Sequence, residues 1–156
     1  MKRRTIFSRC RTYRYVLWRE WETLNEAYAL FVGLNPSTAD EIEDDPTIRR
    51  CVGFAKRWGY GALCMTNLFA YRATDPEVMK AHPAPVGMEN DRWLRAMAKN
   101  AAIVVAAWGI DGAHLHRDRG VIPLLGQELT CLGLTKHGHP AHPLYLKKSL
   151  NPIPFE

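Results

Sequence analysis

The sequence predicts an α/β fold: a single three-layer αβα domain over residues 1–156, with a mostly parallel central sheet of about four strands. Two observations support this fold class. Apolar runs at residues 28–34, 62–69 and 101–108 are typical of strands that are buried on both faces of a sheet. Stretches of helical periodicity alternate with these runs, and no linker of domain size interrupts them, so one domain is expected.

The N-terminal elements are a strand pair and a well-capped helix. Residues 12–18 alternate in polarity, which predicts an antiparallel edge strand with its arginines facing water. Residues 28–34 form the first buried strand. A helix then begins at Asp45-Pro46, because aspartate caps free backbone amides and proline suits the first helical position, and it ends at Gly59.

The remaining elements follow the same alternation. Residues 62–69 form the second buried strand, and the prolines and charges of residues 71–85 predict a long loop. Residues 87–100 have the periodicity of a helix, and residues 101–108 form the third strand. We expect a short helix near residues 111–116 and a fourth strand at residues 128–134.

Charge is divided unevenly along the first third of the chain. Every charged residue before Glu20 is basic, and every charged residue between Glu20 and Ile48 is acidic. The basic segment also carries Phe7, Tyr13, Tyr15 and Trp18, so one interpretation is a surface that tracks a phosphate backbone and stacks on bases. The alternation of these residues favours the other interpretation, an edge strand with solvated arginines.

Cysteine content and hydropathy exclude several classes of protein. The four cysteines lie far apart and form no Cys-x-x-Cys pair, so we expect reduced structural thiols, no zinc site and no cofactor. No apolar run approaches the roughly 20 residues that a membrane span needs, and no signal-peptide pattern follows the basic N-terminus. A cytoplasmic protein without a membrane partner is therefore expected.

Polar segments follow the predicted strands and are the candidates for a site. They are residues 35–40, 67–72, 108–111 and 137–145. Right-handed crossovers bring the carboxyl ends of parallel strands to one edge of the sheet, where open α/β sheets bind their ligands. We therefore expect these segments to meet around one cavity.

Long motifs across the chain resemble the bacterial and phage domain of unknown function 1643. The motifs are Gly33-Leu-Asn-Pro-Ser-Thr-Ala-Asp40, Asp44-Asp-Pro-Thr-Ile-Arg-Arg-Cys51, Trp58-Gly-Tyr-Gly61, Asn67-Leu-Phe-Ala-Tyr-Arg-Ala-Thr-Asp-Pro76 and His142-Pro-Leu-Tyr-Leu146. The resemblance covers nearly the whole chain, but the family name implies no activity.

Three shorter segments are similar to the uracil-DNA glycosylase superfamily. Gly33-Leu-Asn35-Pro36 resembles its water-positioning loop, and Cys64-Met-Thr-Asn67-Leu resembles a strand end that reads the base edge. His142-Pro143-Leu144 resembles the His-Pro segment that donates a hydrogen bond to the departing base, with His139-Pro140 as a rival. The resemblance implies a uracil-DNA-glycosylase-like fold and hydrolysis of N-glycosidic bonds in DNA or a nucleotide.

On that interpretation the expected catalytic residues are Asn35, Asp40 and His142. Asn35 orients a water molecule, Asp40 supplies basicity, and a neutral His142 donates to the base as negative charge grows on it. Leu144 is a candidate wedge for flipping the base out of a duplex, and Arg72 a candidate phosphate contact. The expected substrate-binding residues are Pro36, Ser37, Thr38, Asn67, Phe69, Tyr71, Arg72, Trp108 and Leu144.

Two other functions remain open. One is a catalytically inactive module of the same fold that binds nucleic acid or a nucleotide. The other is a metal-dependent phosphoesterase that holds Mg²⁺ with the acidic residues 40–45, although the pattern at Asp44 and Asp45 favours helix caps over metal ligands. The sequence leaves the base and the oligomeric state open.

Overall fold

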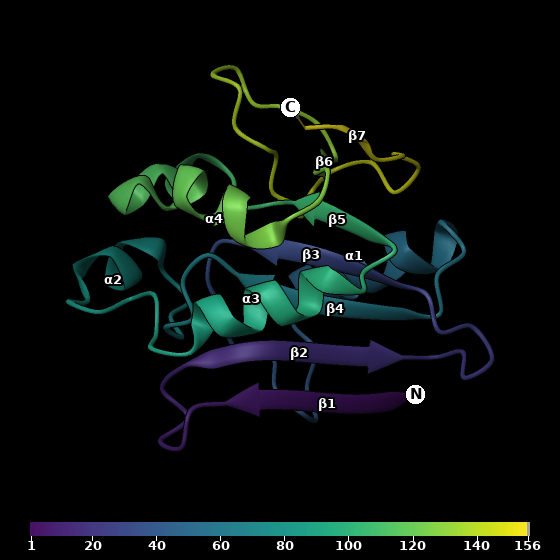
Figure 1. The fold of residues 1–156 in the computed structure, drawn as a ribbon, viewed down its shortest axis with the longest axis horizontal. Coiled ribbons are helices and arrows are strands. Elements are labelled where there is room, and N and C mark those ends of the chain that lie inside the picture. Colours follow the sequence, from purple (N-terminus) through teal and green to yellow (C-terminus); the bar gives the residue numbers. More distant parts are fainter. Residues whose placement is uncertain (156) are drawn as a thin grey trace.

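The structure of the protein, a computed structural model, describes residues 1–155. In these residues seven strands form one sheet in the order β1-β2-β4-β3-β5-β6-β7 (Figure 1). The strands are β1 (Lys2–Phe7), β2 (Arg14–Glu20), β3 (Tyr28–Gly33), β4 (Ala62–Asn67), β5 (Ile103–Ala106), β6 (Thr130–Cys131) and β7 (Ile153–Pro154). The fold is mixed α/β, as predicted.

The sheet is larger and less parallel than predicted. Parallel pairing joins β4, β3, β5 and β6, whereas β1, β2 and β7 pair antiparallel to their neighbours. The expected count of about four strands plus one edge strand was therefore wrong. β1 was missed because its first half is exposed and charged, and β7 because it is only two residues long. The predicted fourth strand, residues 128–134, is reduced to β6.

Helices cover both faces of the sheet. Figure 1 shows α3 (Asn90–Lys99) and α4 (Arg117–Leu125) in front of the sheet and α1 (Pro46–Arg57) behind it. Ile48 and Phe54 of α1 pack with Phe31 on one face. Leu94 of α3 and Val121 of α4 pack in a second apolar cluster on the other face. The core therefore consists of two layers separated by the sheet.

The local signals of α1 are confirmed. The Asp45 carboxylate accepts a hydrogen bond from the Ile48 backbone N–H at 2.9 Å, and Pro46 occupies the first turn. Trp58 caps the C-terminus, and Gly59 follows with φ of +90°, a conformation that glycine adopts without strain. The cap matters for the site because it fixes the entry of the chain into α1.

The second half of the chain contains helices that the sequence patterns did not predict. The segment expected to be a loop, residues 71–85, contains the short helix α2 (Pro76–Ala81). The helix expected near residues 111–116 is present as the 3-10 helix η1 (Ile110–His116). The missed helix α4 contains Gly120 and Pro123, two residues that normally argue against a helix interior.

β2 is an internal strand, so the prediction of an edge strand with solvated arginines was wrong. β1 lies outside it, and Arg14 and Arg19 are only 2% and 0% exposed. The Arg19 guanidinium binds the Asp44 carboxylate at 2.8 Å and also donates to the backbone carbonyls of Trp18, Asp40 and Glu43. The Arg14 Nη1 donates to the Ala39 carbonyl at 2.9 Å.

The basic and acidic segments of the sequence thus largely pair with each other in the folded protein. Basic side chains of β1, β2 and the turn between them contact the acidic segment 40–45, and Arg3–Asp44 and Arg11–Glu41 add exposed ion pairs at 3.3 and 3.0 Å. The aromatic side chains are also engaged, since Tyr15 is buried and Trp18 packs against Tyr28. This segment therefore belongs largely to the folded core.

The strand order places a crevice at the end of β3. The chain leaves β3 through α1 on one face and reaches β4, and it then crosses back over β3 through α3 on the other face to reach β5. In open α/β sheets such a reversal of strand order opens a crevice at the carboxyl ends of the strands. The ends of β3 and β5 therefore form the expected place for a ligand.

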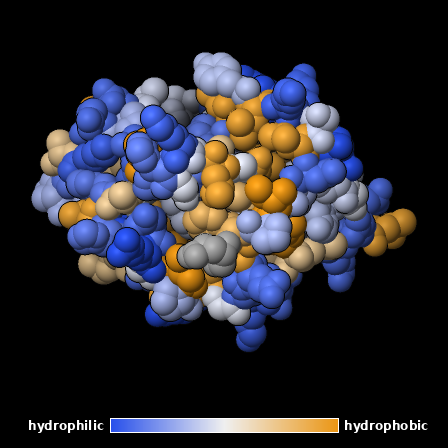
Figure 2. Space-filling model, turned by 90° about the horizontal axis from the view of Figure 1, so that it is seen from above, coloured by the Kyte–Doolittle hydropathy of each residue, from blue (hydrophilic) through white to orange (hydrophobic). Residues whose placement is uncertain are grey.

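The surface near β6 and β7 carries hydrophobic side chains. Seen from that side, they form a central patch with a hydrophilic rim (Figure 2). Leu134 and Ile153 are among the large exposed apolar residues of the chain. Within residues 1–155, no helix combines the length and the apolar character that a bilayer crossing requires.

We predict that Arg19→Ala lowers the free energy of unfolding by about 3 kcal/mol, because it leaves the Asp44 carboxylate and two loop carbonyls without their buried donor. Arg4→Ala, which removes an exposed arginine from β1, is the matched control and should change stability by less than about 0.5 kcal/mol. Urea denaturation measures both. Equal effects of the two substitutions would contradict the anchoring role of Arg19.

Candidate functional site

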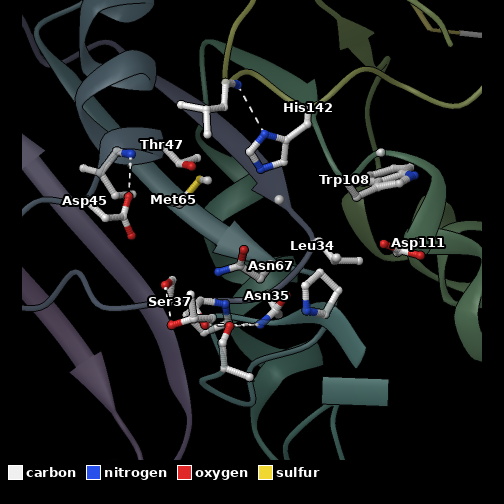
Figure 3. Close-up of a pocket in the computed structure, with 18 of the residues that line it drawn as sticks. Leu34, Asn35, Ser37, Asp45, Thr47, Met65, Asn67, Trp108, Asp111 and His142 are labelled. Carbon is white, nitrogen blue, oxygen red and sulfur yellow. Dashed lines mark hydrogen bonds between the residues drawn. The ribbon is translucent and has the colours of Figure 1, made fainter. Parts of the chain in front are cut away.

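A cavity of about 590 Å³ lies at the carboxyl edge of the parallel strands (Figure 3). Its walls come from the segment after β3, the end of β4, the segment after β5, the first turn of α1 and residues 142–144. Cavities of this size are typical of small-molecule sites. All four polar segments expected to meet contribute residues to the cavity, the segment 67–72 only through Asn67.

Asn67 is held rigidly at the end of β4. It lies opposite Gly33 in the parallel register, and its backbone carbonyl accepts a hydrogen bond from the Asn90 side chain at 2.9 Å. A Cβ atom on Gly33 would be only 2.8 Å from the Asn67 Oδ1, so glycine is needed for this close approach. The Asn67 Nδ2 is buried and has no hydrogen-bond partner among the described residues. It is a donor available to a ligand.

Asn35 is clamped between two loops. Its Nδ2 donates to the Ala73 carbonyl at 2.7 Å and to the Pro36 carbonyl at 3.2 Å. These bonds fix the orientation of the amide and leave Oδ1 to accept a hydrogen bond at the cavity wall. Asn35 therefore does more than start a turn, since it also ties the segment after β3 to the segment before α2.

His142 faces the two asparagines across the cavity (Figure 3). Its Nδ1 accepts a hydrogen bond from the Leu144 backbone N–H at 3.2 Å, so in the neutral ring the proton resides on Nε2. His142 is an exposed residue, and the partial desolvation of its ring lowers its pKa below the ordinary value of 6.5, while the Asp45 carboxylate opposes that shift. The rival residue, His139, does not line the cavity.

The far wall is formed by Trp108 and its neighbours. The Trp108 ring is 2% exposed and lies against Gly112, where a Cβ atom would be 2.2 Å from the ring. Within residues 1–155 the indole Nε1 is buried without a partner. Asp111 completes this wall and accepts a hydrogen bond from Lys80 of α2 at 2.6 Å.

Arg14 is a cavity residue that the sequence analysis did not select. Burial lowers its pKa to about 10 while Asp45 opposes the shift, so the guanidinium is charged at neutral pH. Among the described residues, its Nε has no partner and no carboxylate lies within 4.0 Å of it. An arginine in an alternating Tyr-Arg-Tyr pattern carries no sequence signal that distinguishes it from a solvated one.

The predicted site residues fall into two groups. Those that line the cavity are Asn35, Pro36, Ser37, Thr38, Asn67, Trp108, His142 and Leu144. The others, Asp40, Phe69, Tyr71 and Arg72, do not line it. The residues that line the cavity include at least one from the carboxyl end of each of β3, β4 and β5 or from the segment that follows it.

The four remaining residues have contacts of their own elsewhere. The Asp40 Oδ1 accepts hydrogen bonds from the backbone N–H groups of Ile42 and Glu43, which lower the pKa of Asp40. Phe69 is fully buried beside His114. Tyr71 stacks on His82, and Arg72 donates to the Arg11 carbonyl at 3.2 Å.

The acidic segment 40–45 is occupied by internal contacts. Asp44 and Glu41 accept hydrogen bonds from arginines, and Asp45 caps α1. In the part of the chain that the structure describes, no three His, Cys, Asp or Glu side chains are grouped to hold a metal ion. The carboxylates of this segment stabilise the loop between β3 and α1.

We predict that Gly33→Ala displaces the Asn67 amide and lowers the free energy of unfolding by about 1–3 kcal/mol, because the new Cβ overlaps Oδ1. The control is Gly53→Ala in α1, where a Cβ meets nothing within 4 Å, and which should raise stability by about 0.5–1 kcal/mol. Denaturation curves and the NMR signal of the Asn67 amide report the two effects. An unchanged Asn67 signal in Gly33→Ala would refute the close packing.

We also predict that His142 titrates below 6.5 in the folded protein. The unfolded chain then binds its proton first as the pH falls. The contribution of the neutral ring to stability is therefore fully present above about pH 6.5 and is lost as the pH falls from there through the folded-state pKa. NMR titration gives the pKa, and His142→Gln should flatten the acid side of the stability profile. A pKa above 6.5 would contradict the desolvated, Nε2-protonated ring.

Comparison with known proteins identifies a family but no activity. The model of the family described as "Protein of unknown function (DUF1643)" matches residues 14–144, which include every residue that lines the cavity. Neither the curated proteins nor the solved structures contain a match to the chain. The chain belongs to the family of proteins of unknown function DUF1643.

Proposed function

We propose that the protein hydrolyses the N-glycosidic bond of a nucleobase-containing substrate, as a uracil-DNA-glycosylase-like enzyme. The observation that carries the proposal is the convergence of Asn35, Asn67 and His142 on one cavity from three distant parts of the chain. The short motifs similar to the uracil-DNA glycosylase superfamily supply the same three residues. A cytoplasmic location, expected from the sequence, agrees with such a substrate.

The polar atoms available in the cavity favour a base with carbonyl oxygens. Asn67 offers Nδ2 as a donor, because its Oδ1 packs against Gly33, and the neutral His142 offers Nε2–H. Two donors match the two carbonyl oxygens of uracil, or the carbonyl oxygen and a ring nitrogen of hypoxanthine, and they leave an exocyclic amine unmatched. The donors of Asn67 and His142 therefore set the expected substrate class.

The same atoms suit cleavage of the bond between base and sugar. As the bond breaks, negative charge develops on the base, and the His142 Nε2–H stabilises it as a preorganised donor. Asn35 Oδ1 accepts a hydrogen bond from the water that adds to the sugar carbon, and the proton released from the water neutralises the departing base. Asp45, one of the two carboxylates of the lining residues, is the group that would stabilise the positive charge on the sugar.

A binding module without hydrolysis is the second candidate. The specific observation in its favour is the position of Asp40, the carboxylate expected to supply basicity. Asp40 lies outside the cavity, and its Oδ1 already accepts two backbone hydrogen bonds. In this alternative the cavity recognises the base through the same donors but activates no water.

Base release tests the proposal directly. The wild-type protein is incubated with oligonucleotides that contain uracil, hypoxanthine or hydroxymethyluracil, and with the corresponding free nucleotides, and released base is quantified by chromatography. We predict release from at least one substrate, reduced about 100-fold or more by Asn35→Ala and by His142→Ala, since each removes a group acting on the transition state.

Two matched variants control for nonspecific damage. Asn100→Ala removes an exposed asparagine at the end of α3, and His139→Ala removes the neighbouring histidine that lies outside the cavity. Both should retain activity. Substrate binding without base release in the wild type would overturn hydrolysis in favour of the binding module, and full activity in Asn35→Ala would overturn the assigned site.

A further inference from the structure

The buried Arg14 points to an anion subsite within the cavity. We propose that the cavity takes a free mononucleotide, with its phosphate bound by the Arg14 guanidinium. The inference rests on the proposed function only for the position of the base. It adds the class of substrate, a small anionic nucleotide instead of a duplex.

The contrast between the two buried arginines of β2 carries the argument. A buried guanidinium is costly unless its charge and its donors are matched. Arg19 has a carboxylate partner at 2.8 Å and three backbone acceptors. Arg14 has one backbone acceptor and a buried Nε without a partner among residues 1–155, and it lines the cavity. An anionic ligand would complete its coordination.

Neighbouring groups in the cavity wall suit a phosphate. The first turn of the 12-residue helix α1 lines the cavity with Thr47, whose hydroxyl can donate to a phosphate, whereas the Asp45 carboxylate already caps the N-terminus of this helix. The hydroxyl groups of Ser37 and Thr38 lie in the same wall. Arg14 is the one cation among the lining residues, and the Asp45 and Asp111 carboxylates lie in the same wall, so the wall admits at most one anionic group, held at Arg14.

The depth of Arg14 favours a terminal phosphate. Only 2% of the residue is exposed, so the anion must enter the cavity to reach it. A phosphate at the end of a mononucleotide can do so, whereas a phosphodiester needs an exit for the chain on both sides. Glu43, exposed on the loop after the cavity segment, would disfavour a polyanion that approached along this edge.

Calorimetry with matched ligands tests the subsite. Deoxyuridine, deoxyuridine 5′-monophosphate and a short single-stranded oligodeoxyuridylate are titrated into the full-length protein. We expect the mononucleotide to bind at least 10-fold more tightly than the nucleoside, and inorganic phosphate to compete with the mononucleotide but not with the nucleoside. Arg14→Gln should reduce the ratio of the two affinities to about 1.

Two further variants separate binding from folding. Arg4→Gln removes an exposed arginine of the neighbouring strand β1 and should keep both the stability and the affinity ratio, and Arg14→Lys should keep part of the ratio because it retains a cation. The thermal stability of the wild type with inorganic phosphate needs no variant, and the melting temperature should rise with phosphate concentration.

The outcomes distinguish this inference from the proposed function. Equal affinities of the wild type for nucleoside and mononucleotide, or an unchanged ratio in folded Arg14→Gln, would overturn the subsite even if base release is observed. Tighter binding of the oligonucleotide than of the mononucleotide would overturn the choice of a free nucleotide. Arg14-dependent phosphate binding without base release from any substrate would uphold the subsite and overturn only hydrolysis.

Discussion

The site depends on the buried contact between Arg19 of β2 and the loop that joins β3 to α1. The Arg19 guanidinium binds the Asp44 carboxylate and the carbonyls of Asp40 and Glu43, and Arg14 holds the same loop at Ala39. This loop begins with Asn35 and ends with the Asp45 cap of α1. Without these two buried arginines, the acidic segment would lack the hydrogen bonds that hold it against the sheet. The distance between the cavity walls formed by residues 35–38 and by α1 would then no longer be fixed.

The order of the strands places the other residues of the cavity. β3 lies between β4 and β5, so Asn67 is placed beside Gly33 by the parallel register, and Trp108 follows the neighbouring strand. His142 arrives from outside the sheet, on a segment held by backbone hydrogen bonds from Gly109 to Pro140 and from Ala141 to Gly133. Asn67 at the end of β4, Asn35 in the segment after β3 and His142 on a tethered segment thus share a cavity.

Much of this arrangement could be predicted because its signals are local. The buried strands, the Asp45-Pro46 helix start and the polar residues at strand ends follow from hydrophobic runs and capping chemistry. The roles of Arg14 and Arg19 could not be predicted, since burial of an arginine depends on which strand pairs outside it and on which acidic loop it meets. Asp40 was selected for proximity in sequence, yet its carboxylate turns back to its own loop. α4 was missed because tertiary packing overrides the helix-breaking tendency of Gly120 and Pro123.

The central claim is that the cavity receives a nucleobase between Asn67 and His142. A crystal structure of the protein with deoxyuridine bound tests it most directly. We expect the uracil ring to lie in the cavity beside Trp108, with its carbonyl oxygens at hydrogen-bond distance from the Asn67 Nδ2 and the His142 Nε2. A base bound at another surface, or one in the cavity that leaves both donors without contact, would contradict it.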